Sequence, residues 1–236
     1  MNKICYLFLF VSINIFCQKS NLVMTKDSDS TFIKYQKDRC EFFKVSEIQN
    51  IDSKFIFRFW TDSYVLEIKK NEDQIFGSII FSVEDTNIKK NYFRKEFALD
   101  RKKTDEIYSK ITDENFNLPN LKWESGFDGN LFIYEIKNFN FYDYKSYATC
   151  CNDISEAKKY LELNDFITSL IDIKEISNTF SNEIPFVCYK NYNGAYGICK
   201  VEKLKRNKEI RKHNRSKKLS QWKPSEQLPK IQTFKN

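Results

Sequence analysis

Histidine and glycine are scarce in this sequence, which has one histidine and five glycines among 236 residues. The single histidine, His213, lies among basic residues near the C-terminus. A Ser–His–Asp or Cys–His nucleophilic site is therefore not expected, and a histidine-based metal site is excluded. No glycine-rich loop of the kind that cradles phosphate groups is present. These absences argue against a conventional enzyme, and we predict neither a cofactor nor a metal.

Long apolar runs are also lacking. The longest, residues 4–16, is shorter than the roughly 20 residues that a membrane-spanning helix needs. It follows Lys3 and precedes a polar stretch, a layout typical of a signal peptide over residues 1–17. We therefore expect an exported protein, periplasmic or extracellular, with no transmembrane span in the mature chain. Lipid attachment at Cys17 is an alternative, disfavoured because Phe16 stands where that processing needs a small residue. A buried N-terminal helix in a cytosolic protein is the other interpretation.

Five cysteines remain outside the predicted signal peptide, and export permits disulfides between them. Cys188 and Cys199 flank a turn sequence at residues 191–194, so they could lie on paired strands of a hairpin. A bridge between these two, or from either to Cys150 or Cys151, is the leading prediction. A zinc site formed by the same four cysteines is the alternative, disfavoured because adjacent cysteines chelate awkwardly.

The composition, 41% hydrophobic and 16% aromatic, supplies a sizeable core. Alternation is clear where Phe55, Phe57 and Phe59 lie on one side of a strand and Ile56, Arg58 and Trp60 on the other. Asn- and Asp-rich turns separate further candidate strands, which predicts a meander of antiparallel strands. The predicted strands are 55–60, 64–68, 75–83, 92–99, 131–136, 139–147, 186–189 and 196–201.

Two helices are predicted to pack on this sheet. The shorter begins near Asp100 or Thr104, and the main amphipathic helix begins near Asp153 or Ser155 and ends near Ser177. The fold class is therefore α+β. The predicted organisation is a signal peptide at 1–17, an irregular lead-in at 18–50 with room for one helix or short strand, a single α+β domain at 51–202 and a disordered tail at 203–236.

That tail is strongly basic, with twelve Lys and Arg residues against two Glu. The rest of the chain holds 27 basic and 30 acidic residues, so the formal charge of +7 comes from the tail alone. Such a segment cannot bury enough apolar surface to fold alone. It could bind an anionic surface or another polyanion, with Trp222 as an interfacial anchor, or be a solvated extension.

Several short motifs follow one another along the central part of the chain. They are Phe57-Arg58-Phe59-Trp60, Asn117-Leu118-Pro119, Phe127-Asp128-Gly129, Tyr144-Lys145-Ser146-Tyr147 and a closing amphipathic helix. Over residues 55–175 this succession resembles a loose group of bacterial α+β proteins that has no established reaction. The chain departs from the group's better examples at two positions. Those examples have a Trp before the Leu-Pro step, where this chain has Phe116, and a Pro after the aromatic strand, where this chain has Thr149. The resemblance implies a fold and no activity.

A few residues are candidates for a functional site. Asp128 lies between two glycines in a turn that could present its carboxylate to a ligand, although it could equally cap the turn. Glu124 and Glu135 could complete a set of carboxylates for acid–base hydrolysis. Arg58 and Trp60 could hold an anionic ligand against an aromatic ring, or the arginine could extend to the edge of the sheet and pair with a carboxylate there. Tyr142 and Tyr144 belong to an aromatic strand that is either a sugar- or peptide-binding surface or an ordinary two-sided strand.

The sequence favours a binding protein of unknown partner over an enzyme. One alternative is a small hydrolase whose carboxylates centre on Asp128. The other is an envelope-associated protein held by its basic tail.

Overall fold

The computed structural model describes residues 23–24, 35–114, 116–119, 121, 130–149, 155–194, 196–200, 208–209, 211–212 and 215. The chain divides into two compact units, Met1–Gly197 and Ile198–Asn236. In the second, the described residues include the short strand β9 (Ile198–Cys199). The predicted signal peptide, Glu124, Asp128, Cys150, Cys151 and most of the basic tail lie outside the described residues.

A mostly antiparallel sheet forms the centre of the first unit, which confirms the α+β class. The strand order is β1-β7-β6-β2-β3-β4, β5 lies along β4, and β8 pairs with the last two residues of β4. Among the strand pairings in the described part of the chain, only that of β1 with β7 is parallel. The strands are β1 (Val23–Met24), β2 (Phe55–Trp60), β3 (Tyr64–Asn71), β4 (Gln74–Asp85), β5 (Tyr92–Ala98), β6 (Leu131–Asn138), β7 (Phe141–Ala148) and β8 (Cys188–Lys190).

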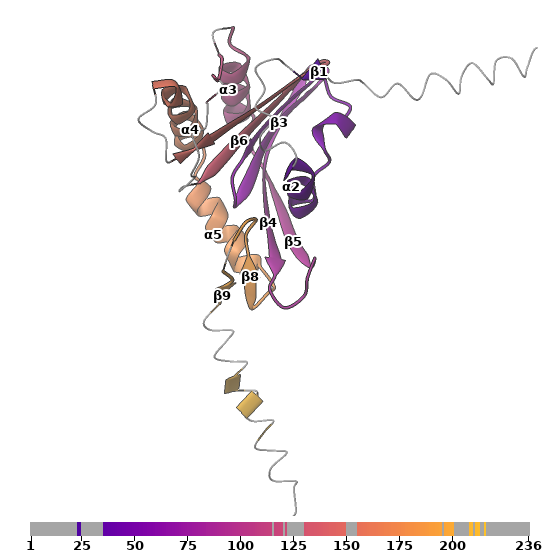
Figure 1. Cartoon of the computed structure of the whole chain (residues 1–236), viewed down its shortest axis with the longest axis vertical. Coiled ribbons are helices and arrows are strands. Elements are labelled where there is room, and N and C mark those ends of the chain that lie inside the picture. The colour runs from indigo at the N-terminus through magenta and orange to yellow at the C-terminus, as the bar shows by residue number, and fades with distance from the viewer. Residues whose placement is uncertain are drawn as a thin grey trace, which may run out of the picture. The chain divides into compact units, whose positions relative to one another are not determined.

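Helices cover both faces of this sheet (Figure 1). The face that carries Phe55, Phe57 and Phe59 packs against α3 (Arg101–Thr112), α4 (Lys158–Leu170) and α5 (Ile173–Glu183) in one apolar core. The opposite face packs against α2 (Gln36–Phe43) and the 3-10 turn η2 (Ile48–Asn50) in a second, smaller core. Part of the predicted lead-in, α2 and η2, therefore forms a layer of its own on the sheet. Because this layer covers the second face, both sides of β2 are buried.

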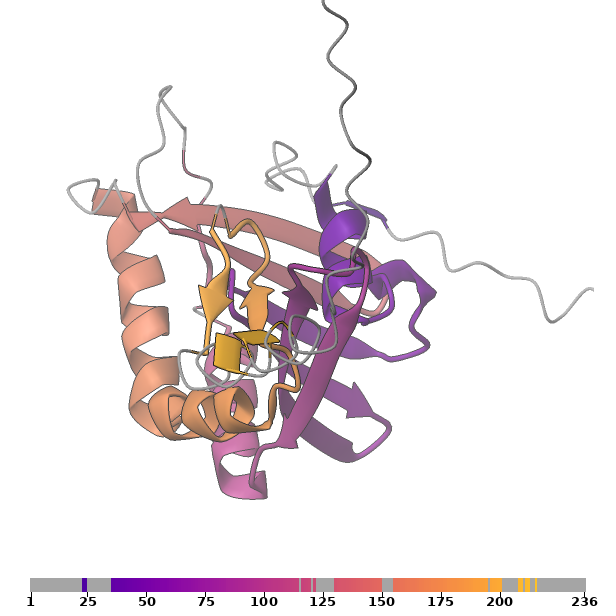
Figure 2. The same cartoon turned by 90° about the horizontal axis from the view of Figure 1, so that it is seen from below.

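The main helix predicted to end near Ser177 is two helices, and this part of the prediction is wrong. Helix α4 ends at Leu170 because Ile171 is extended, and Asp172 starts α5 by accepting a hydrogen bond from the Glu175 amide at 2.9 Å. Figure 2 shows the sharp change of direction between them. Asp100 caps α3 in the same way, as predicted, with its carboxylate accepting from the Lys103 amide.

Candidate functional site

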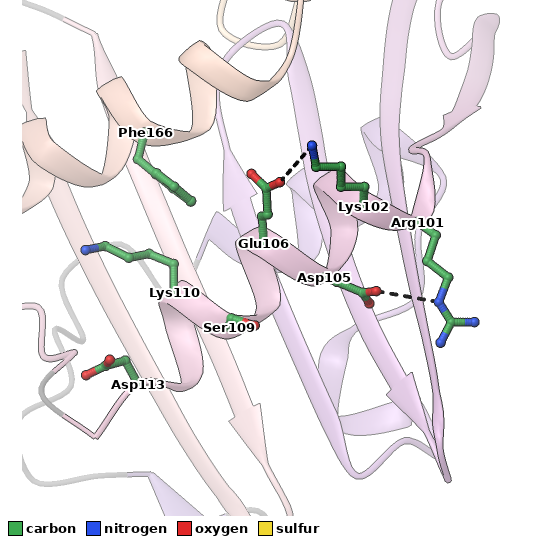
Figure 3. A pocket seen from close by; sticks show the side chains of 8 residues that line it. All are labelled: Arg101, Lys102, Asp105, Glu106, Ser109, Lys110, Asp113 and Phe166. Atoms are coloured by element: carbon green, nitrogen blue, oxygen red, sulfur yellow. Dashed lines mark ion pairs between the residues drawn. The ribbon is translucent and has the colours of Figure 1, made fainter.

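A surface hollow of about 840 Å³ lies along α3. Figure 3 shows its charged side chains pairing along the helix, Arg101 with Asp105 at 3.5 Å and Lys102 with Glu106 at 4.0 Å, while Phe166 of α4 borders it. These groups are solvated, and exposed ion pairs of this kind are worth little energetically. We call this feature the α3 hollow. It contains no buried polar group that would select a ligand.

A row of charged residues crosses the middle of the sheet on the α2 face. Glu135 of β6 lies directly opposite Arg58 of β2, and Arg58 lies directly opposite Glu67 of β3. All three side chains are buried, with at most 4% of each residue exposed. The Nε of Arg58 donates to Oε2 of Glu67 at 2.6 Å, and Lys69 pairs with the other oxygen of Glu67 at 2.7 Å. Negative, positive and negative charges thus alternate across three adjacent strands.

Three side chains from three different elements donate to Glu135. Gln36 of α2 donates to Oε2 at 2.7 Å, Trp60 of β2 donates to the same oxygen at 2.5 Å, and the Tyr142 hydroxyl of β7 donates to Oε1 at 2.6 Å. Together with the row of charges, these contacts form what we call the α2-face network. Replacing a buried ion pair by apolar residues is often neutral or stabilising, so stability alone does not account for this network.

Burial dominates the protonation of the network. It raises the pKa of Glu135, against the charge of Arg58 and the hydrogen bonds from Tyr142 and Trp60, which lower it. For Arg58, burial acts to lower the pKa, but the opposing effect of the facing carboxylates of Glu67 and Glu135 is larger. The pKa of Arg58 is therefore raised, and the guanidinium stays charged. Burial likewise raises the pKa of the neighbouring Cys40 thiol to about 12, which leaves it protonated at neutral pH.

A polar pocket of about 400 Å³ adjoins the network, between the segment after α2 and strands β2–β5. We call it the α2 pocket. The segment contributes Lys44, Val45, Ser46, Asn50, Ile51 and Asp52. The strands contribute Arg58, Glu67, Lys69, Ile80, Arg94 and Glu96. Its volume lies within the range of small-molecule sites.

Arg58 has more hydrogen-bond donors than the described residues satisfy. A guanidinium carries five N–H groups, and here Nε donates to Glu67 while Nη2 forms an ion pair with the same oxygen at 2.6 Å. Nη1 has no hydrogen-bond acceptor in the part of the chain that the structure describes, and Nη2 has none besides its ion-pair contact with Glu67. Buried donors are almost always satisfied, so this incompletely satisfied guanidinium in the pocket wall is exceptional.

The structure brings together four of the candidate residues named from the sequence. Arg58, Trp60 and Glu135 belong to the α2-face network with Tyr142, and Tyr144 lies directly opposite Glu135 on β7. All five are buried, with no more than 7% exposed. Arg58 pairs with a carboxylate in the middle of the sheet, not at its edge. On the aromatic strand the exposed rings are Phe139 and Phe141.

Sequence reasoning missed Gln36 and Glu67, and also Arg39, whose charge opposes the rise in the pKa of Glu135. Gln36 and Arg39 lie in α2, whose buried positions are Gln36, Arg39, Cys40, Phe42 and Phe43. Two of these five positions are polar, so the helix shows only a weak apolar stripe. A usable signal was present in the strands. Arg58 stands between Ile56 and Trp60 on an otherwise apolar strand face, and Glu67 and Glu135 each follow an aliphatic residue on the same face, Val65 and Ile133.

Cys188 and Cys199 are both disulfide-bonded, in agreement with the predicted bridge, so neither is available as a zinc ligand. Within the described ranges, no three His, Cys, Asp or Glu residues are grouped so that they could hold a metal ion. Among the helices that the structure describes, none has the length and apolar character needed to cross a membrane.

No known protein family, curated protein or solved structure matches this chain. The chemistry of the site therefore rests on its own residues.

Proposed function

We propose that this chain is an exported binding protein whose ligand occupies the α2 pocket. The observation that carries the proposal is Arg58, a buried guanidinium in the pocket wall whose Nη1 has no hydrogen-bond acceptor among the described residues. Charges kept in an interior without a stability benefit are typical of functional sites. The signal-like N-terminus and the disulfide-bonded state of Cys188 and Cys199 support export.

The hydrolase alternative receives less support. Of its three carboxylates, Glu135 is fully buried and already accepts three hydrogen bonds, so it does not face an open cleft. Asp128 and Glu124 lie outside the described residues. Tail-mediated attachment to an anionic surface stays a prediction, to be tested by vesicle sedimentation with and without residues 203–236.

The proposal can be tested by ligand-observed NMR on the purified chain, with mixtures of amino acids, sugars, organic acids and nucleotides. Ser46 is exposed at the rim of the α2 pocket, so Ser46→Trp should block entry. Ser109→Trp places the same bulk in the α3 hollow and serves as the matched control. We expect a compound that binds the wild type and Ser109→Trp but not Ser46→Trp. Binding that Ser46→Trp leaves intact would place the site elsewhere.

A further inference from the structure

The donors of Arg58 indicate the chemical class of the ligand. One carboxylate oxygen, Oε2 of Glu67, is the partner of both Nε and Nη2, at 2.6 Å each. The remaining N–H groups of the guanidinium point away from this edge, since the five donors form a rigid planar fork. A guanidinium edge of this kind matches two oxygens of one carboxylate or phosphate better than a single neutral acceptor.

Two of the three carboxylates that line the α2 pocket are already engaged in ion pairs. Glu67 lies between Arg58 and Lys69, and Glu96 pairs with Arg94 at 2.6 Å. Arg94 is held in place because its Nε donates to the carbonyl of Phe43 at 3.2 Å. These ion pairs leave both carboxylates neutralised, whereas donors of Arg58 remain.

The balance of charge around the pocket points the same way. Its lining has four basic side chains, Lys44, Arg58, Lys69 and Arg94, against the three carboxylates Asp52, Glu67 and Glu96. Lys44 lies over the ring of Tyr92, with Nζ 4.2 Å from the ring centre, and forms a cationic rim. In a partly enclosed site this surplus favours an anion, because charge interactions are less screened there than at the surface.

We infer that the α2 pocket binds a small molecule through an oxyanion group, a carboxylate or a phosphate, which accepts hydrogen bonds from Arg58. The inference rests on the proposed function and specifies its ligand. The cationic side chains of Lys44 and Lys69 at the pocket's edge add attraction without the planar fit that Arg58 supplies.

The test titrates the full chain with inorganic phosphate and, separately, with succinate, while sodium chloride keeps the ionic strength constant. The readouts are the side-chain Nε–H resonances of arginine and the thermal midpoint. At least one anion should bind with saturation and shift the Arg58 resonance. Arg58→Lys should weaken binding about tenfold because it keeps the charge and loses the fork. Arg101→Lys, on exposed α3, should leave binding unchanged. The stronger of the two anions identifies the group.

Arg58→Lys could fail to fold, because breaking a buried ion pair is costly. Lys69→Gln and Lys44→Gln change partly or fully exposed residues and should each weaken the same binding several-fold in a folded protein. A response that is linear in both anions, or binding that Lys69→Gln and Lys44→Gln both leave unchanged, would overturn the inference. If neither anion binds, but a neutral compound binds the wild type and not Ser46→Trp, the inference fails and the proposed function stands. If nothing binds the pocket, both fail.

Discussion

Glu135 is a carboxyl group that the folded chain surrounds with donors and removes from water. Its folded pKa is raised above the ordinary 4.5, chiefly by burial, so the folded state holds this proton more tightly than the unfolded chain does. The resulting stabilisation is complete below pH 4.5 and is lost as the pH rises through the folded pKa.

Glu135→Gln removes this titration. We therefore expect the free energy of unfolding of the wild type, minus that of Glu135→Gln, to decrease as the pH rises above 4.5 and through the folded pKa of Glu135. Urea denaturation at constant ionic strength across this range measures the difference. A difference that stays constant would mean that Glu135 titrates alike in the folded and unfolded states.

Glu72 occupies a strained position in the two-residue turn between β3 and β4, with a φ of 51° in the left-handed region. A residue other than glycine is strained there because its Cβ crowds the backbone. Glu72→Gly should raise the free energy of unfolding by about 1 kcal/mol, measured by urea denaturation. Glu72→Ala keeps the Cβ and hence the strain, so it should produce no such gain. Equal effects from both substitutions would point to the charge of Glu72 instead.

Helix α3 lies so close to β4 that Gly77 leaves no room for a methyl group. A Cβ at this position would lie 2.5 Å from Oγ1 of Thr104. Thr104 is buried and its hydroxyl donates to the carbonyl of Asp100, so it cannot move away freely. Gly77→Ala should therefore destabilise the wild type by about 2 kcal/mol, measured by urea denaturation.

The same substitution in a Thr104→Ala background should cost much less, since Oγ1 and Cγ2 of Thr104 are removed and only Cδ1 of Ile68, at 3.1 Å, remains close. The difference between the two costs is the coupling energy of a double-mutant cycle. A coupling energy near zero would show that the destabilisation comes from the strand and not from the contact with α3.

The strands and the start of α3 could be predicted from the sequence because alternation and a capping Asp are local signals. Phe55, Phe57 and Phe59 do share the apolar core, and Asp100 does cap its helix. The division between α4 and α5 was missed because apolar spacing continues from Leu170 through Ile173 and Ile176, and only Asp172 marks the break.

The candidate site could be predicted only in part. Arg58, Trp60, Glu135 and Tyr142 stood out by residue type, but nothing local shows that Glu135 and Arg58 are cross-strand neighbours. Their pairing joins strands separated by more than 70 residues in sequence. Gln36 and Arg39 were hidden because two of the five buried positions of α2 are polar, so the apolar pattern that reveals most surface helices is weak.

At the scale of the molecule, residues 191–194 follow β8, which begins at the disulfide-bonded Cys188, and they contact α2. Tyr192 packs edge-on against Phe42 of α2, and the guanidinium of Arg39 lies 5.2 Å from the centre of the Tyr192 ring. Asn193 donates to Asp62 in the turn between β2 and β3 at 3.4 Å. We therefore expect that a change in the position of residues 191–194 would weaken the packing of α2.

Reduction of the predicted bridge between Cys188 and Cys199 should lower the free energy of unfolding by about 3 kcal/mol, the loop-closure effect for a loop of roughly ten residues. Thermal unfolding with and without a reductant measures the effect. A variant with both cysteines changed to Ser should already show the lower stability and should no longer respond to the reductant. A continuing response would implicate other cysteines.

The two layers that cover the sheet differ in how firmly they are held. Three helices pack on one face through large apolar side chains, whereas α2 has eight residues and meets the other face partly through Gln36 and Arg39. Such a layer opens at a lower free energy than the rest, as a separate cooperative unit. Amide hydrogens of α2 should exchange with solvent well before those of β2 and β6. This partial opening gives a ligand a way into the interior without global unfolding.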